Sequence, residues 1–568
     1  MIAALVVGTM VALILAYRFY GAFLSRQLGL DDRTPTPAAA INDGLDYVPA
    51  KPSLLLGQHF SAIAAAGPIV GPVLAGLYFG WLPAFLWIVI GAIFVGGVHD
   101  TTSLVASVRH KASSIGQIVR TYMSPTAQVL FLVFVWLALV YVIVAFTDVT
   151  AQTFKALSDE APNLGAGVAV SSVLYLVLGV AMGVALYKFK VNLTLATAIC
   201  LPLLFLVIWV GPRAPQPVLD WFDSLSVQQW DLIILAYCFV ASIAPMWLLL
   251  QPRGYLGGWF LYITIFVGLI GALFGGFAVQ YPAINLNGIY SALPGQEGTM
   301  LFPILFITIA CGACSGFHSI ICSGTTSKQL DKESDARILG YGAMLLEALV
   351  AVMALATVMI LAPGDDMLKA KPNIIYANGL ARYMEMFGIN YGAALGFALL
   401  AFSTFVYDTL DVCTRLARYV LQELFGWTNK TGAFVGTLAS LLLPMAILMT
   451  TKENSYLIAW QIFGTSNQLL ASLTLLAVSV WLKKTGRNAW YTIIPMVFMM
   501  TMTMWSLVLH FMPFVKSLLH FAAAPQMGSQ LAVTGIVGIV LVVLALFLLL
   551  EAFNVLVLRA NRIVKDPA

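Results

Sequence analysis

The chain has 568 residues, of which 61% are hydrophobic and 10% are charged, and its mean hydropathy is +0.92. A soluble domain needs a polar surface toward water, so this composition excludes a soluble enzyme or a soluble binding module. Apolar runs of about 20 residues, the length that crosses a bilayer, recur along the chain. The composition therefore indicates an all-α, polytopic membrane protein whose main partner is the lipid bilayer.

The apolar runs predict about 15 transmembrane helices. They are expected near residues 1–24, 58–79, 82–107, 127–147, 166–187, 191–211, 231–251, 258–280, 300–322, 338–362, 389–412, 431–450, 455–482, 489–512 and 530–556. With the N-terminus outside, roughly 22 of the 29 basic residues fall on the cytoplasmic side, as the positive-inside rule requires. The C-terminus is then cytoplasmic, and 213–230 and 363–388 are among the external loops. The net charge of +4 is an orientation signal, and no nucleic-acid partner is expected.

Two of the apolar runs are broken by helix-disrupting residues at matching depth. The breaks are Ala66-Gly67-Pro68-Ile69-Val70-Gly71-Pro72 and Cys311-Gly312-Ala313-Cys314-Ser315-Gly316-Phe317-His318. Inside lipid, a break is tolerated only where protein or a water-filled cavity covers the freed backbone groups. A pair of such breaks points to the substrate site of a transporter. We therefore expect substrate to bind at Gly67, Pro68, Gly71, Pro72, Ser315 and Gly316.

The predicted topology sends the two broken spans across the membrane in opposite directions. Opposite directions are what an inverted repeat requires, and each break can be followed by four further spans. We predict one membrane transport domain, 1–568, with five-helix repeats at 53–211 and 300–482. The spans at 231–280 are an insertion, and 489–568 holds the C-terminal spans. Half-helix ends in such carriers present partial charges to substrate and ions.

Two acidic residues stand well inside predicted spans, where a charged side chain is costly and needs a reason. Glu347 lies about a third of the way into 338–362, and Asp100 follows His99 inside 82–107. We expect Glu347 or Asp100 to bind and release a coupling proton. The alternative for Glu347 is that it caps a backbone group or pairs with a basic neighbour.

Two more carboxylates, Asp408 and Asp411, are three residues apart, and Arg415 follows Asp411 by four. All three side chains can therefore share one helical face. One interpretation is an ion pair that ties a helix end to the cytoplasmic rim. The other is a proton-coupling carboxylate whose affinity for the proton is set by Arg415 and by burial.

Histidines and hydroxyls gather near the two breaks. His59 and His318 each stand close to a broken segment, and imidazole titrates closest to physiological pH. We expect them to donate hydrogen bonds to substrate or to transfer protons. Ser319 and Thr325 offer hydroxyls that suit a carboxylate, an amide or a small cation. The alternative is that these hydroxyls bond back to helix carbonyls.

No spacing typical of a metal site or a nucleotide site is present. The chain has neither an HExxH motif nor two paired CxxC motifs, and Cys311 and Cys314 are interpreted as packing residues inside a span. There is no Walker motif, so an ion gradient rather than ATP is expected to drive transport. We expect no resident metal and no cofactor other than a proton or sodium as coupling ion.

Several long motifs, in the same order along the chain, carry a family resemblance. They include Ala16-Tyr17-Arg18-Phe19-Tyr20-Gly21, Gly57-Gln58-His59-Phe60, Trp247-Leu248-Leu249-Leu250-Gln251-Pro252-Arg253, Ser315-Gly316-Phe317-His318-Ser319 and Thr414-Arg415-Leu416-Ala417-Arg418-Tyr419. Over nearly its whole length the chain resembles the carbon starvation protein A family. The resemblance implies an inner-membrane carrier related to those with five-helix inverted repeats. Gln58 departs from a Gly-His-His-Phe pattern, which weakens a two-histidine metal site.

The resemblance implies peptide uptake under nutrient limitation, with pyruvate–proton symport in a close branch. Our leading prediction is a proton-driven importer of small carboxylated nutrients, peptides first, used under carbon starvation. The nearest alternative is a pyruvate–proton symporter. An intramembrane metalloenzyme built on His59, His99, Asp100 and His318 is a third possibility, and a nutrient sensor is a fourth. The residues predict no oligomeric state.

Overall fold

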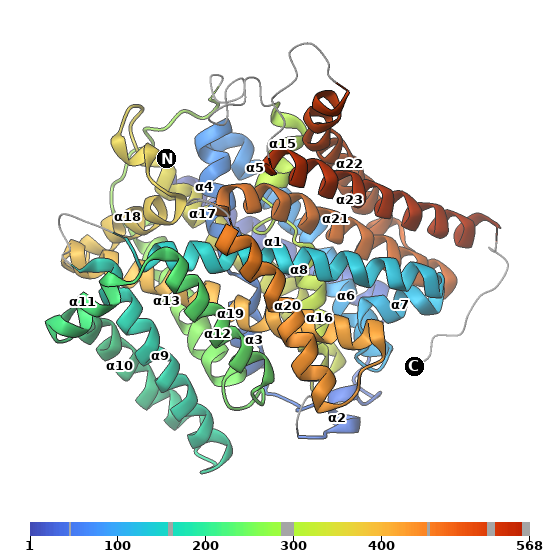
Figure 1. Cartoon of the computed structure of the whole chain (residues 1–568), viewed down its shortest axis with the longest axis horizontal. Coiled ribbons are helices and arrows are strands. Elements are labelled where there is room, and N and C mark those ends of the chain that lie inside the picture. The colour runs from blue at the N-terminus through green and yellow to red at the C-terminus, as the bar shows by residue number, and fades with distance from the viewer. Residues whose placement is uncertain (45–46, 157–162, 286–299, 451–454, 520–528, 559–568) are drawn as a thin grey trace.

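The computed structural model describes residues 1–44, 47–156, 163–285, 300–450, 455–519 and 529–558, and this part of the chain consists of helices and connecting loops (Figure 1). In these residues, 12 helices are long and apolar enough to cross a membrane, and two bent pairs raise the number to 14. A further broken span, too short in each half to count alone, occupies the predicted run 300–322. The chain is a multi-pass α-helical membrane protein, as predicted.

The helices follow the predicted order of apolar runs. Their bounds are α1 Ile2–Leu28, α2 Pro37–Ile41, α3 Pro52–Ile63, α4 Gly67–Phe79, α5 Trp81–Gly91, α6 Gly97–Arg109, α7 Ile115–Tyr122, α8 Pro125–Thr153, α9 Leu164–Tyr187, α10 Leu193–Val210, α11 Gln216–Ser224, α12 Val227–Ile243, α13 Leu250–Phe274, α15 Leu301–Thr308, α16 Gly316–Gly324, α17 Ala343–Met359, α18 Pro372–Glu385, α19 Tyr391–Phe425, α20 Lys430–Thr450, α21 Ser455–Lys484, α22 Trp490–Leu518 and α23 Ser529–Phe553. The last residues of the predicted C-terminal segment, 559–568, lie outside the described residues.

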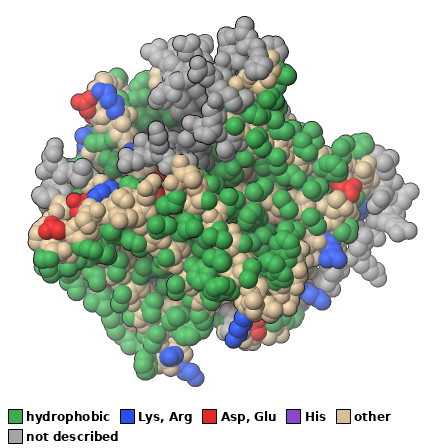
Figure 2. Space-filling model, in the orientation of Figure 1, with side chains coloured by type: hydrophobic (Ala, Val, Ile, Leu, Met, Phe, Trp, Pro, Cys, Tyr) green, Lys and Arg blue, Asp and Glu red, His purple; other side chains and the backbone are tan. Residues whose placement is uncertain are grey.

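The outer surface is apolar. On the face shown in Figure 2, hydrophobic side chains cover most of the area, and charged side chains lie toward its rim. Peripheral α10 buries only Ala196, Cys200 and Leu204, a stripe with four-residue spacing that faces the protein. The other faces of α10 expose large apolar side chains such as Trp209. Such a surface is stable against lipid tails, whereas water would disfavour it.

Both predicted breaks are present, but each lies slightly before its predicted position. The chain is non-helical at 64–66 and at 309–315, whereas Gly67 and Gly316 already begin α4 and α16. Pro68 sits in the first turn of α4, where its missing N–H has no helical partner to lose. The Gly-Pro run therefore marks the start of a half-helix rather than the unwound residues.

The two broken spans cross in opposite directions. α3 packs against α16, and α4 packs against α15, so the first half of one span meets the second half of the other. This antiparallel crossing is the geometry that an inverted repeat produces. The repeat boundaries at 53–211 and 300–482, and the insertion at 231–280, stay predictions.

The span that follows each break contains a π-helical turn. Ala92–Gly96 separates α5 from α6, and Arg337–Gly342 precedes α17. α6 packs against α16, while α17 packs against α4, so each of these spans contacts the half-helix of the other broken span. π turns occur often at functional sites. Here they come shortly before the two buried carboxylates Asp100 and Glu347.

The predicted boundary between the spans 231–251 and 258–280 is wrong. α12 ends at Ile243 because Pro245 follows and cannot continue the helix. α13 already begins at Leu250, and its first turn accommodates Pro252. Arg253, which the prediction left in the connection between two spans, is therefore helical and only 1% exposed.

Two of the loops that were predicted to be external contain helices. The stretch 363–388 contains α18, which packs against α19 and α13 and buries Tyr376 and Tyr383. The stretch 213–230 contains α11, which meets α12 at an angle of 98°.

Candidate functional site

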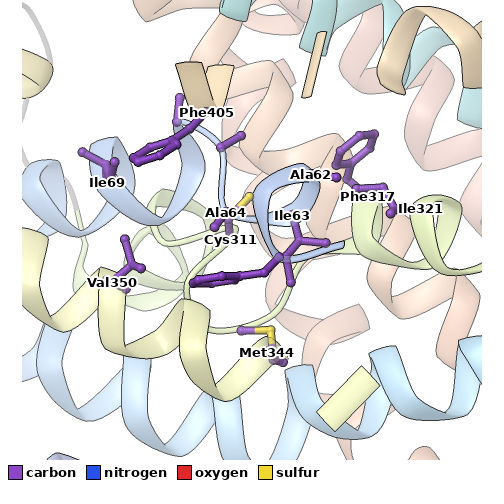
Figure 3. Packing of buried hydrophobic residues seen from close by; sticks show 14 of the residues in the cluster. Ala62, Ile63, Ala64, Ile69, Cys311, Phe317, Ile321, Met344, Val350 and Phe405 are labelled. Carbon is purple, nitrogen blue, oxygen red and sulfur yellow. The ribbon is translucent and has the colours of Figure 1, made fainter. Parts of the chain in front are cut away.

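The two breaks lie in direct contact at the centre of the bundle. A Cβ added to Gly67 would stand 2.3 Å from Cys311 Sγ, and one added to Gly71 would stand 2.6 Å from the carbonyl oxygen of Thr308. Figure 3 shows Ile63 and Ala64 beside Cys311 at this crossing. Only glycine allows the two segments to approach so closely. Pro68 and Pro72 are buried beside them.

Two amides of α21 satisfy the backbone groups that the second break frees. Asn467 Oδ1 accepts from the Phe317 N–H at 2.8 Å, and Asn467 Nδ2 donates to the Ala310 carbonyl at 3.1 Å. Gln468 Nε2 donates to the carbonyl oxygens of Phe306, Ile309 and Cys314. A break within the membrane needs such partners, because lipid supplies none. Asn467 also contacts Ser315 Oγ at 3.1 Å.

We expect Asn467→Leu to destabilise the break and to reduce transport. The change leaves the Phe317 N–H and the Ala310 carbonyl buried without partners, and each unpaired group costs about 1–3 kcal/mol. Thermal unfolding of the purified protein in detergent measures the loss. Ser466→Ala is the matched control, because the Ser466 hydroxyl donates only to carbonyls of its own helix among the contacts described. Equal stability of N467L and S466A would contradict the prediction.

The structure brings three of the predicted residues into one buried cluster, Asp100–His318–Glu347. His318 Nδ1 lies 2.8 Å from Asp100 Oδ2, and His318 Nε2 lies 3.2 Å from Glu347 Oε2. His99 Nδ1 is 2.7 Å from the other oxygen of Asp100. All four side chains are fully buried. Asp100 comes from α6, His318 from α16 and Glu347 from α17. The cluster therefore connects the two spans that contain π turns with the second broken span.

An imidazole between two carboxylates is an arrangement that can hold and pass a proton. The charged form of His318 would pair with both carboxylates. When His318 loses its proton, the positive charge between the two buried carboxylates disappears. Neither Glu347 oxygen has a hydrogen-bond partner in the described residues. A proton on Glu347, or one shared with His318, removes the cost of an isolated buried charge. The three side chains are therefore placed so that they can share a proton.

Cys311 lies next to this cluster. Its Sγ and one ligand atom each from His318 and Glu347 lie within 4.8 Å of one another. A thiol, an imidazole and a carboxylate together suit a transition metal. With Nδ1 paired to Asp100, Nε2 of His318 faces Glu347 at 3.2 Å and has no hydrogen-bond partner among the described residues. We interpret the group as a proton-sharing cluster, and metal binding by the same three residues stays the alternative.

The other predicted histidine and hydroxyls take local partners. His59 Nδ1 lies 2.8 Å from Thr326 Oγ1, on the side of α3 that faces α16. Ser319 donates to the Gly316 carbonyl and also contacts Thr474, while Thr325 donates to the Ile321 carbonyl. These two hydroxyls thus follow the alternative in which they bond back to helix carbonyls.

A second charged network, Asp408–Arg253–Asp411, contains the other two predicted carboxylates. Arg253 Nε lies 3.2 Å from Asp408 Oδ1, and Arg253 Nη1 donates to Asp411 Oδ2. Tyr237 donates to Asp411 at 2.7 Å, and Ser61 donates to Asp408. α13, α12 and α3 thereby converge on α19.

The predicted pairing of Asp411 with Arg415 is wrong in detail. Arg415 donates to the carbonyl oxygens of Ala241 and Ala244, which lie at the end of α12. These carbonyls have no helical partner at a helix end, and a basic side chain there is favourable. Helical spacing indicated a shared face correctly, but the partner of Asp411 comes from α13. A correct start for α13, indicated by Pro252, would have drawn attention to Arg253.

Related sequences agree on one family for this chain. The model of the carbon starvation protein CstA family matches residues 1–374 and 366–506. This chain belongs to the CstA family. A peptide transporter CstA of Bacillus subtilis (strain 168) is 32% identical, and the alignment covers 83% of this chain and 84% of that protein.

Another relative of this chain is named for a different substrate. The pyruvate/proton symporter BtsT of Escherichia coli (strain K12) is 31% identical over 89% of this chain and 81% of its own length. Among solved structures, a manganese transporter of Eremococcus coleocola is 12% identical with a TM-score of 0.49, covering 91% of this chain and 99% of that one. The similarity to that structure supports no inference about function.

Proposed function

We propose that this CstA-family protein is a secondary transporter that imports small carboxylated nutrients across the inner membrane, with peptides as the first substrate class. The observation that carries the proposal is the crossing of two broken spans beside the fully buried Asp100–His318–Glu347 cluster. Relatives named as peptide transporters and as a pyruvate/proton symporter support it. The family name supports a role under carbon starvation.

In this proposal, substrate binds where the half-helices meet. The N-termini of α4 and α16 carry partial positive charge, which attracts a substrate carboxylate. We propose Gly67, Pro68, Gly71, Pro72, His59, Ser315, Gly316, His318, Ser319 and Thr325 as the residues that line this site. The site opens to one side of the membrane at a time, as alternating access requires.

The coupling ion in this proposal is a proton. Glu347 and Asp100 bind and release it through His318, and Asp408 and Asp411 are further candidates. The groups that face Glu347 are His318 of α16, Asp100 of α6 and Cys311 in the break. The N-terminus is proposed to lie outside and the C-terminus in the cytoplasm, because this orientation places most basic residues inside.

Uptake into sealed liposomes tests the function. We expect an inward proton gradient to drive uptake of a labelled dipeptide, with unlabelled pyruvate failing to compete. Uptake of pyruvate alone would move this chain to the monocarboxylate branch, which the relative named as a pyruvate/proton symporter favours. Uptake driven only by sodium would contradict proton coupling. Uptake of neither compound under either gradient would contradict the proposal.

A further inference from the structure

Arg253 occupies a cage of acidic and aromatic side chains. It is 1% exposed, and its guanidinium carbon lies 5.9 Å, 5.5 Å and 5.3 Å from the ring centres of Tyr175, Tyr237 and Tyr407. Nη1 is held by Asp411 and by the hydroxyl of Tyr237. Aromatic faces attract a guanidinium and fix its plane. The orientation of Arg253 is therefore set before any ligand arrives.

One edge of this guanidinium has no hydrogen-bond partner. Nε and Nη2 are both buried, and neither makes a well-aligned hydrogen bond with a described residue, although the side chain of Tyr175 lies beside the guanidinium. Asp408 Oδ1 lies 3.2 Å from Nε without alignment for a hydrogen bond, and the hydroxyl of Ser61 donates to the other oxygen of Asp408. The N–H groups of Nε and Nη2 point in parallel, which matches the two oxygens of a carboxylate. Buried donors without partners are costly, so a fold retains them where a ligand pairs with them.

The open edge lies next to the first break. Ser61 belongs to the last turn of α3, just before the unwound residues 64–66. A Cβ on Gly257 of α13 would stand 2.1 Å from Asp408 Oδ2 and 2.4 Å from Ser61 Oγ. The absence of a side chain at Gly257 thus keeps α13, α3 and α19 in contact at this point. A group bound to Arg253 would lie within reach of the break.

Resting on the proposed transport function, we infer that the Nε–Nη2 edge of Arg253 binds the carboxylate of the transported substrate. The substrate takes the place of Asp408 at this edge, and Asp408 keeps its hydrogen bond from Ser61. Arg253 is then the residue that selects carboxylated substrates over their neutral counterparts. This role differs from that of the half-helix N-termini, which attract a carboxylate without bidentate geometry.

Charge balance connects this site with coupling. With both aspartates ionised, Arg253, Asp408 and Asp411 carry one net negative charge. A substrate carboxylate adds another, and buried charges need partners. A zwitterionic dipeptide brings its own ammonium group, whereas a monocarboxylate must be accompanied by a proton. Binding beside Arg253, Asp408 and Asp411 therefore requires fewer accompanying protons for a dipeptide than for a monocarboxylate, and these three residues favour the dipeptide.

The test compares a dipeptide with its C-terminal amide in sealed proteoliposomes. For the wild-type protein we expect KM for labelled Ala-Ala to be at least about tenfold lower than KM for the labelled amide, since hydrogen bonds to charged groups are the stronger ones. Arg253→Gln is expected to raise KM for the free acid to the level of the amide. Arg253→Lys keeps the positive charge but lacks the two parallel N–H groups of the guanidinium. We expect it to give an intermediate ratio of the two KM values. Arg213→Gln, on an exposed Arg above Trp209, is the control.

The possible results separate failure of this inference from failure of the proposed transport function. Wild-type protein that transports both compounds with equal KM overturns the inference without any variant. R253K that retains the full wild-type ratio also overturns it, and this variant keeps the buried charge if R253Q fails to fold. Absence of dipeptide and pyruvate uptake by the wild type contradicts the proposed function instead. Transport of pyruvate alone moves the same comparison to pyruvate and pyruvamide, with the same expected ratios.

Discussion

Replacement of Glu347 by Gln is expected to reduce strongly the accumulation that a proton gradient drives. Glutamine keeps the shape of the side chain but cannot bind the proton, and it loses the ion pair with His318. Coupling free energies of 1–3 kcal/mol correspond to changes of about 5- to 150-fold, so accumulation should fall by a factor in this range. Exchange of labelled for unlabelled substrate without a gradient should persist, because Glu347 itself is not among the proposed substrate contacts. Uptake into liposomes, with and without a gradient, measures both quantities.

Two further variants sharpen this experiment. Asp100→Asn alters the other carboxylate that faces His318 and should cause a similar loss of driven uptake. Glu385→Gln, at the exposed end of α18, is the matched control and should change nothing. Proton-driven accumulation by E347Q at the wild-type level would rule out Glu347 as the coupling carboxylate. Loss of exchange together with driven uptake would instead indicate a damaged fold.

Gly316→Ala is expected to abolish transport and to lower stability strongly. The added Cβ would stand 2.3 Å from the backbone nitrogen of Ala471 and from the backbone carbonyl oxygen of Asn467. Backbone of α21 cannot rotate away as a flexible side chain can, so α16 has to move. Overpacking in a dense interior costs about 1–3 kcal/mol and sometimes more. The shift also pulls Phe317 away from the side chain of Asn467, which holds the break.

The control for this variant is another helical glycine. A Cβ at Gly8 of α1 would meet nothing within 4 Å. Gly8→Ala should therefore leave transport unchanged and stabilise the helix slightly, because alanine has the higher helix propensity. Apparent melting temperatures in detergent and uptake into liposomes compare the two variants. Wild-type uptake by G316A would show that the contact between α16 and α21 tolerates movement.

The fold was largely predictable from the sequence, because the signals that define it are local. Runs of apolar residues located the helices, and Gly-Pro-rich interruptions located the breaks. The first break was predicted to begin two residues late, since Pro68 marks the first turn of α4 as well as a disruption. The boundary near Pro245 was missed because the apolar run continues through it. Hydropathy alone does not show where a helix ends inside an apolar stretch.

The site was less predictable, because its contacts join distant parts of the chain. Asp100, His318 and Glu347 were each identified as costly polar groups, yet nothing in one sequence indicates that His318 lies between the two carboxylates. Asp411 had a basic residue at the right helical spacing, and this local pairing suggested Arg415. The partner found in the structure, Arg253, lies on another helix. Local periodicity identifies the face of a helix but not the neighbour it meets.

The broken helix α3 separates the two charged networks. His59 directs its ring to Thr326 beside α16, and Ser61 donates to Asp408 on α19. Residues two positions apart in a helix point about 200° away from each other, so the two contacts lie on opposite faces. A sideways shift of this single helix would loosen one contact as it tightens the other. α3 thus contacts residues beside both networks directly, so a movement of this one helix would change both sets of contacts at once.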